Sequence, residues 1–286
     1  GMFPFGDLEQ IQKEVDFNLR REQVIKVHGS EHLVETENGS EQYDRILIAT
    51  GARAFAPPVK GLEPEDAFLM RTVEDALRFK DRLKKNDIKH AVVIGASMAG
   101  IKVVEVLHKY GIETWLLDLA SYIFPLAAYK EVAKEIEKRV EAQGVHLMFG
   151  VTIDHMEQEN GEKTAVLTDG SRIPADIVGL CIGTRAITET VQGEVEIGRG
   201  IVVDDHMRTS VPGIYAAGDC CEGNNLESGQ NQIIGLWANA NHQGETAGIN
   251  MAGGDMAYKG NILHNITHFM NMDFIGFGDN RMQGEV

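Results

Sequence analysis

The residues best suited to chemistry begin where an apolar run ends at Ile94. Gly95, Ser97 and Gly100 follow in the pattern G-x-S-x-x-G, and helix-like sequence comes directly after them. In such a pattern the first glycine permits a tight turn, a small middle residue lets the backbone reach a diphosphate, and the last glycine lets helix and strand pack closely. Free N–H groups at the helix start favour phosphates. Although Ser97 stands where glycine is usual, the pattern predicts a dinucleotide site at Gly95, Ser97, Met98, Ala99 and Gly100.

An acidic residue at the end of the next apolar run indicates the type of dinucleotide. Asp118 follows Trp115-Leu116-Leu117, at a distance from Gly95 that is typical of such sites. Its carboxylate can accept a hydrogen bond from a ribose 2′-hydroxyl and would repel a 2′-phosphate. Because no arginine follows in residues 119–121, NAD is favoured over NADP. The alternative interpretation of the whole pattern is a glycine-rich turn that binds nothing.

The elements that must position these residues alternate between helix and strand from residue 72 onward. Thr72 and Asp75 can form a capping box, in which each side chain bonds the other's backbone N–H, so a helix should begin here. The apolar pattern predicts helices over 72–85, 99–110 and 129–143 and strands over 91–95, 113–118 and 145–149. This alternation indicates βαβ units on a parallel sheet and hence an α/β fold.

Other segments have β character or are difficult to place. Asn38-Gly39 between two alternating runs predicts a hairpin. Buried strands are expected over 177–182, ending at Gly183, and over 214–217, and a long helix is expected over 228–251. The glycine- and aromatic-bearing residues 258–286 show no pattern that would complete a domain.

The composition of the chain limits its classes of function. The 286 residues are 43% hydrophobic and carry a net charge of −16. Their number suggests more than one domain, and the acidic balance disfavours nucleic acid and anionic lipid as partners. No apolar run is long enough for a membrane helix. Three cysteines, two of them adjacent, and the lack of a secretion signal indicate a reducing cytoplasm.

Three further segments, taken in order, resemble a known family. Residues 43–51, YDRILIATG, resemble the "YDxLxxATG" segment of FAD-dependent pyridine nucleotide-disulfide oxidoreductases. Residues 207–219, MRTSVPGIYAAGD, resemble their second FAD signature, and residues 236–244 resemble the helix that follows it. The branch most resembled is that of the NADH oxidases, NADH:rubredoxin reductases and nitrite-reductase flavoprotein domains. The resemblance extends over about residues 20–260.

The resemblance implies a domain organisation and an activity. It implies two Rossmann-like domains, with an NAD-binding domain over 72–190 inserted in a partial FAD-binding domain over 1–71 and 191–257. Residues 258–286 would begin an interface domain, and a homodimer is one expectation from the family. NADH would pass hydride to FAD, and electrons would then reach an unidentified acceptor, either a small molecule or a small redox protein. The cofactors carry this chemistry, so no side chain is named as catalytic.

The resemblance also implies which residues contact the cofactors. The residues implied at FAD are Ala49, Thr50, Gly51, Gly218, Asp219, Trp237 and Ala238, and Gly183 is added to those at NAD. Asp219 would accept a hydrogen bond from a ribityl hydroxyl, since a carboxylate is suited to that role. The helix that contains Trp237 would direct the positive end of its dipole at the flavin.

The chain departs from the family pattern at both ends. No strand with G-x-G-x-x-G precedes Tyr43, and the family's N-terminal redox cysteines are missing with it. The family's interface domain is longer than residues 259–286, so the chain looks cut at both ends. The alternative function is therefore a catalytically incompetent NAD-binding remnant. An NAD-dependent dehydrogenase without flavin is disfavoured, because it does not predict the segments 43–51 and 207–219.

Lys102 is a smaller departure, because relatives commonly carry glutamate at this position. Its ammonium group could pair with Glu105, with a substrate carboxylate or with the flavin. The simpler interpretation, which we favour, is a solvated helix residue.

The cysteines and two histidines are weaker candidates. Adjacent Cys220 and Cys221 could form only a strained disulfide, so they are interpreted as small buried residues, and Cys181 is expected in the core. His264 and His268 lack a third ligand nearby, so no metal site is expected.

Overall fold

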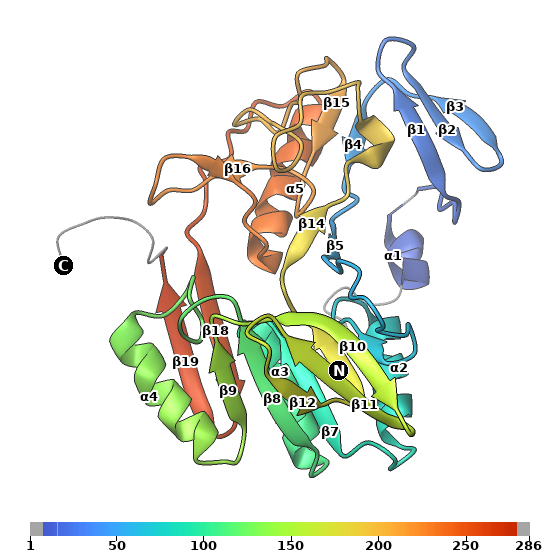
Figure 1. Ribbon diagram of the computed structural model, residues 1–286. Coiled ribbons are helices and arrows are strands. Elements are labelled where there is room, and N and C mark those ends of the chain that lie inside the picture. The colour runs from blue at the N-terminus through green and yellow to red at the C-terminus, as the bar shows by residue number, and fades with distance from the viewer. Residues whose placement is uncertain (1–7, 16, 279–286) are drawn as a thin grey trace.

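A five-stranded parallel sheet in the order β6-β13-β7-β8-β9 lies in the lower group of elements in Figure 1. We call it the middle sheet because its strands come from the middle part of the sequence. The structure is a computed structural model that describes residues 8–15 and 17–278. The strands of this sheet are β6 (Ala67–Phe68), β7 (His90–Ile94), β8 (Glu113–Asp118), β9 (His146–Phe149) and β13 (Ile177–Leu180). The associated helices are α2 (Val73–Leu83), α3 (Met98–Lys109) and α4 (Lys130–Glu141). The predicted alternation is confirmed, with element ends shifted by one or two residues.

Two apolar cores cover the two faces of this sheet. Val93 and Leu116 belong to the core that α3 and α4 complete, whereas their chain neighbours Val92 and Leu117 belong to the opposite core. All four side chains are fully buried, as expected for a parallel sheet covered on both sides. The second face is covered by an antiparallel sheet, whose strands are β10 (Ile153–Glu159), β11 (Glu162–Leu167) and β12 (Arg172–Pro174).

The capping box predicted before α2 is confirmed. The Thr72 hydroxyl accepts a hydrogen bond from the Asp75 backbone N–H at 3.1 Å, and the Asp75 carboxylate accepts one from the Thr72 backbone N–H at 2.9 Å. Two of the donors that a helix leaves unpaired at its start are thereby satisfied.

A second group of elements is built from the residues that precede the middle sheet in the sequence and from those that follow it (Figure 1). Parallel strands β4 (Ile46–Ile48) and β15 (Ile214–Ala216) pack against α5 (Trp237–Met251). Val27, Ile201, Ile214 and Ala247 lie in their common core. Further elements here are α1 (Leu8–Glu14), β1 (Val24–His28), β2 (Leu33–Thr36), β3 (Gly39–Gln42) and the 3₁₀ turn η1 (Glu189–Val191). The hairpin predicted at Asn38-Gly39 is the β2–β3 connection.

Two antiparallel strands join the two groups. The chain enters the middle sheet after β5 (Ala52–Ala54) and leaves it through β14 (Thr184–Ala186), and these strands pair with each other. The side chains of Arg53 on β5 and Glu189 of η1 also form an ion pair. Entry and exit therefore lie side by side, so the middle group is inserted at one place in the other.

The sequence-based prediction of a helix over 228–251 is wrong at its beginning. The short strands β16 (Gly223–Asn224) and β17 (Asn231–Gln232) pair there instead, and α5 begins only at Trp237. Gly229 has φ +66° in the turn between them, a conformation that glycine adopts without steric cost. Asn225 and Gln230, whose backbones bond across this turn, are polar and so provide no apolar face for a helix.

Residues 258–278 have a definite place, which the sequence did not indicate, and residues 279–286 lie outside the described residues. Strands β18 (His264–Phe269) and β19 (Met272–Phe277) form a hairpin that packs against α3. Phe269, Met270 and Phe274 are buried in the core that α3 and α4 share. No helix within the described residues is long and apolar enough to cross a membrane.

Candidate functional site

A cavity of about 850 Å³ opens at the carboxyl ends of β7, β8 and β13. Ligands of open α/β sheets bind at this edge. Of the residues predicted to bind NAD, the cavity is lined by Gly95, Ser97, Met98, Ala99, Asp118 and Gly183. Gly100 follows Ala99 within the first turn of α3 and is not among the lining residues. The structure therefore brings together a set of residues that the sequence spreads over nearly ninety positions.

Two glycines are required for the backbone to make the turn before α3. Gly95 has φ +103°, and a Cβ on it would overlap the carbonyl oxygen of Cys181. A Cβ on Gly100 would overlap the carbonyl oxygen of Gly95. Helix α3 can approach β7 and β13 this closely only because both positions lack a side chain.

Ser97 has a role beyond its small size, because it is the N-cap of α3. Its hydroxyl accepts a hydrogen bond from the Gly100 backbone N–H at 3.2 Å and donates one to the Cys181 carbonyl at 3.0 Å. The cap uses one of the helix's unpaired donors. The N–H groups of Met98 and Ala99, which have no partner within the helix, remain at the cavity.

Asp118 joins the two loops that border the cavity. One carboxylate oxygen accepts a hydrogen bond from the Ala96 backbone N–H and the other from the Ala120 backbone N–H, both at 2.7 Å. Each oxygen retains a second lone pair for a ligand hydroxyl. No lysine or arginine is among the described residues that line the cavity, so a bound anion would depend on the end of α3 and on neutral groups.

The residues predicted at FAD gather at the carboxyl ends of β4 and β15. These strands are parallel neighbours, so Ala49-Thr50-Gly51 and Gly218-Asp219 leave the sheet at one edge. Gly51 has φ +67° and Gly218 has φ +83°. Trp237 and Ala238 form the first turn of α5. The Asp219 carboxylate and the close-approaching glycines fit the ribityl end of a flavin. No glycine turn that could hold the flavin's diphosphate precedes β4 within the described residues.

Two residues that the sequence analysis missed hold this edge in place. The Arg71 guanidinium pairs with the Asp219 carboxylate at 2.7 Å and donates to the Ala52 carbonyl at 3.1 Å. The fully buried Gln243 accepts a hydrogen bond from the Gly218 backbone N–H at 2.8 Å. Gln243 lies in the third family-like segment and could have been singled out there. Arg71 carries no comparable local pattern.

Lys102 makes one of its proposed pairings and an unexpected one. Its ammonium lies 3.2 Å from Glu105 and also donates to the His268 carbonyl on β18. The side chain is 45% exposed, so the favoured interpretation as a purely solvated residue is incomplete. Lys102 connects α3 to the C-terminal hairpin.

The three cysteines are buried and free. Burial raises the pKa of the Cys181 thiol to about 12, and its neighbour Cys220 together with burial raises the pKa of Cys221 well above the usual range. Both adjacent thiols donate to backbone carbonyls, Cys220 to Ala217 at 3.2 Å and Cys221 to Gly218 at 3.4 Å. The burial of both thiols agrees with the prediction, whereas the hydrogen bond with Cys221 lowers the pKa of Cys220 to about 6.

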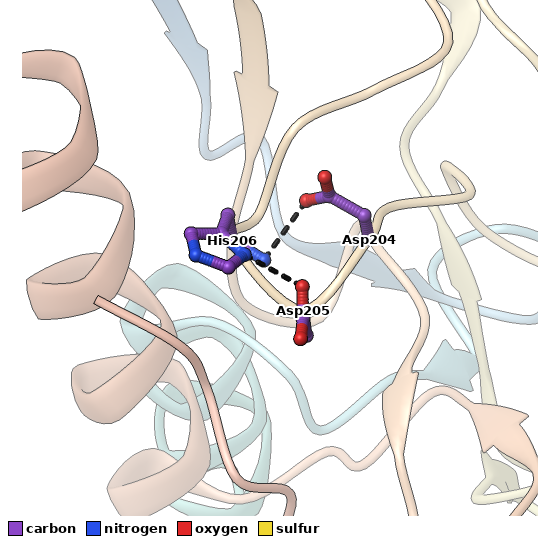
Figure 2. Close-up of side chains that lie close together, drawn as sticks. All are labelled: Asp204, Asp205 and His206. Carbon is purple, nitrogen blue, oxygen red and sulfur yellow. Dashed lines mark hydrogen bonds and ion pairs between the residues drawn. The ribbon is translucent and has the colours of Figure 1, made fainter. Parts of the chain in front are cut away.

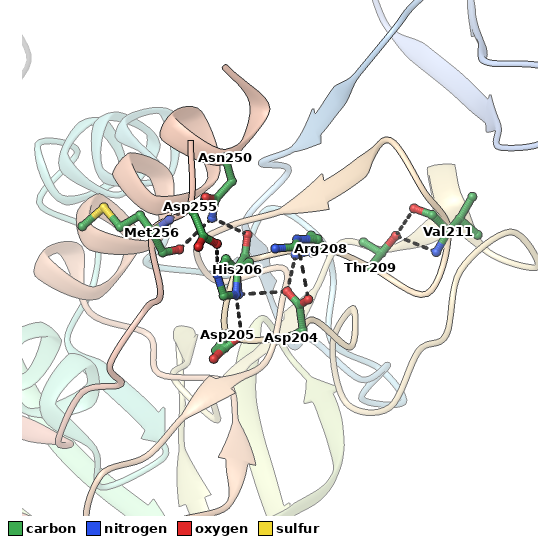
Figure 3. Close-up of polar contacts among 9 residues, drawn as sticks. All are labelled: Asp204, Asp205, His206, Arg208, Thr209, Val211, Asn250, Asp255 and Met256. Atoms are coloured by element: carbon green, nitrogen blue, oxygen red, sulfur yellow. Dashed lines mark hydrogen bonds and ion pairs between the residues drawn. The ribbon is translucent and has the colours of Figure 1, made fainter. Parts of the chain in front are cut away.

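One group of three acidic and histidine side chains in the described residues is close enough to hold a metal ion: Asp204, Asp205 and His206 (Figure 2). Its members already bond within the protein. The His206 ring lies 2.6 Å from Asp205 and 2.9 Å from Asp255, and Asp204 accepts the backbone N–H groups of His206 and Arg208 (Figure 3). The group ties a loop to the residues after α5, and none of its members lines the cavity.

The chain is similar to several known proteins. The model of the family described as pyridine nucleotide-disulphide oxidoreductase matches residues 4–244. The NADH oxidase of Methanocaldococcus jannaschii is 30% identical over 213 residues, which cover 74% of this chain and 47% of that protein. The chain spans about half the length of the first curated relatives it matches.

Solved structures show the same fold. The crystal structure of reduced Bacillus anthracis CoADR-RHD superposes with a TM-score of 0.89 at 28% identity, over 96% of this chain and 51% of that one. An NAD-dependent persulfide reductase from A. fulgidus gives a TM-score of 0.85 at 27% identity, over 94% of this chain and 51% of that one. The predicted α/β fold with Rossmann-like domains is confirmed.

Proposed function

Because the chain belongs to the pyridine nucleotide-disulphide oxidoreductase family, we propose that it supplies the NADH site of a flavoprotein oxidoreductase. In this proposal hydride passes from NADH to FAD, and electrons then pass to an acceptor. The observation that carries the proposal is the glycine turn before α3, which opens onto a cavity of about 850 Å³ together with Asp118. Relatives include an NADH oxidase, which favours this function over a catalytically incompetent NAD-binding remnant.

The chain's own residues bind and orient NADH in this proposal. The backbone N–H groups of Met98 and Ala99 at the start of α3 bind the diphosphate. Asp118 accepts a hydrogen bond from the adenosine ribose and disfavours a 2′-phosphate. Gly183, with φ +102° and open space beside it, lets the nicotinamide end reach the edge of β13. When bound, the cofactors supply the redox chemistry.

We assign the flavin end to the edge formed by β4 and β15. Asp219 holds a ribityl hydroxyl, and the first turn of α5 at Trp237 and Ala238 places positive partial charge beside the flavin ring. Residues 1–71 and 191–257 form the flavin part and residues 72–190 the NAD part. The acceptor is a small molecule or a small redox protein, and the whole protein is a homodimer.

Absorbance spectroscopy tests the proposal. The protein is mixed with FAD, freed of unbound flavin and scanned near ~450 nm, where a bound flavin absorbs. We expect retained flavin absorbance that bleaches when NADH is added without oxygen. A colourless protein that NADH still stabilises against heat would support the remnant instead.

A further inference from the structure

The C-terminal hairpin forms one wall of the nucleotide cavity, although the sequence analysis assigned it no part in the site. Leu263 and Asn265 line the cavity together with Met98 and Ala99 of α3. Side chains alternate along β18, so Asn265 lies on the same side as Phe269, which is fully buried. Ile266 lies on the opposite side and is 69% exposed. Asn265 therefore faces the interior.

Several contacts hold the hairpin in this position. Lys102 of α3 donates to the His268 carbonyl, and Glu105 accepts a hydrogen bond from the Met270 backbone N–H at 3.2 Å. The ring of Phe269 meets that of Phe124, in the loop after β8, edge-on at 5.4 Å. The wall is thus fixed to the helix that begins at the glycine turn.

These contacts also determine where Asn265 lies along α3. Strand β18 and helix α3 run in the same direction, because Lys102 contacts His268 and the later residue Glu105 contacts the later residue Met270. Three residues of strand span about 10 Å, and four residues of helix, from Lys102 back to Met98, span about 6 Å. Asn265 therefore lies toward the start of α3, and it lines the same cavity as Met98 and Ala99, where the helix would bind a diphosphate.

Two polar side chains at the cavity already bond within the protein. The Ser97 hydroxyl both accepts and donates within the protein, and both Asp118 oxygens accept backbone N–H groups. The side-chain amide of half-buried Asn265 has no hydrogen-bond partner among residues 8–15 and 17–278. A carboxamide has two N–H donors, so this inward side chain is available to an acceptor on a ligand.

We propose that Asn265 binds the dinucleotide by donating its side-chain N–H to a diphosphate oxygen, and that Lys102 is the positioning residue that holds it there. The proposal rests on the proposed NADH site. Phosphate oxygens only accept hydrogen bonds, so a carboxamide N–H suits them and a carboxylate in its place would repel them. With no lysine or arginine among the described lining residues, this neutral donor faces the helix start across the diphosphate.

Calorimetric titration with NADH and with ADP-ribose tests the Asn265 contact. Asn265→Asp should bind both ligands at least about tenfold more weakly, because both contain the diphosphate and a tenfold change corresponds to about 1.4 kcal/mol. Asn271→Asp, at the exposed tip of the same hairpin, adds the same charge and should bind like the wild type. Equal affinities of the two variants would overturn the proposal. Weaker binding of NADH alone would assign Asn265 to the nicotinamide half and overturn the diphosphate contact.

A measurement on the wild-type chain does not depend on how a variant folds. The side-chain NH₂ resonance of Asn265, assigned by its loss in Asn265→Ser, should shift when ADP-ribose is added. An unshifted resonance at saturation would contradict the contact. A wild type that binds neither ligand is a different result, because the NADH site itself would then be refuted.

Lys102→Met tests the positioning role, with Lys109→Met as the matched control. Both lysines lie 3.2 Å from Glu105, but in the structure Lys102 also reaches the hairpin. Lys102→Met should speed backbone amide exchange over residues 264–270 and weaken ADP-ribose binding several-fold, and Lys102→Arg should restore both. Lys109→Met should change neither. Unchanged exchange and affinity in Lys102→Met would refute the positioning role.

Discussion

The Arg71 guanidinium lies 2.7 Å from the Asp219 carboxylate and so joins the segment before α2 to the turn after β15. The same side chain donates to the Ala52 carbonyl on β5. Arg71, which directly precedes α2, thus contacts both β5 and Asp219, the acid proposed to hold the flavin ribityl chain. Asp219 is 17% exposed and Arg71 37% exposed, which leaves the pair partly screened by solvent.

Arg71→Met should destabilise the chain modestly and leave Asp219 without its partner. A partly exposed pair contributes roughly 0.5–1 kcal/mol, and we expect a loss of that size in the free energy of unfolding by urea. Flavin retention should fall as well, since Asp219 loses its orientation. Arg172→Met removes the more exposed pair with Glu157 and should cost less and leave flavin retention unchanged. Identical results for the two variants would contradict the role given to Arg71.

Gly100→Ala should abolish NADH binding. The new methyl group would overlap the Gly95 carbonyl oxygen, which forces α3 away from the turn and costs about 1–3 kcal/mol of stability. Gly244→Ala on α5 is the matched control, because nothing lies within 4 Å of the methyl position; it should keep full NADH affinity. Tight NADH binding by Gly100→Ala, measured by calorimetry, would show that the turn does not hold the dinucleotide.

Asp118→Asn should weaken the preference for NADH over NADPH. The amide keeps one acceptor for the loop N–H groups of Ala96 and Ala120 but removes the negative charge that repels a 2′-phosphate. The ratio of the two dissociation constants should fall by about tenfold or more. Asp154→Asn, a charge change elsewhere on the cavity wall, should leave the ratio unchanged. A ratio unaffected by Asp118→Asn would remove Asp118 from the ribose site.

His206 should make stability depend on pH. The hydrogen bond to Asp205, assisted by Asp255, raises the pKa of His206 above its usual value of 6.5. Because the folded pKa is the higher one, the contribution is fully present below about pH 6.5 and is lost as the pH rises through the folded pKa. His206→Asn should therefore lower the melting temperature more at pH 5.5 than at pH 8.5. Equal losses of melting temperature at the two pH values would contradict the role given to His206.

Local sequence patterns were sufficient to predict most of the strands and helices of the middle sheet. Thr72 and Asp75 predicted a helix start because a capping box is formed by residues three apart. Gly95 and Gly100 predicted a tight turn for steric reasons that the structure reproduces. The helix over 228–251 was predicted too long because Gly229 supports a turn between two very short strands.

Contacts between distant segments could not be predicted from one sequence. Asp219 has no local feature that identifies Arg71 as its partner, since 148 positions separate them. The position of β18 on α3 depends on a lysine donating to a carbonyl 166 positions away. Asn265 is therefore visible as a cavity residue only in the folded chain.

Calorimetric titration of the intact chain with NADH at several temperatures tests the central claim most directly. We predict saturable heat with one site per chain, which Gly100→Ala abolishes and Gly244→Ala preserves. No heat at any temperature, or equal heat from both variants, would contradict a dinucleotide site at the start of α3.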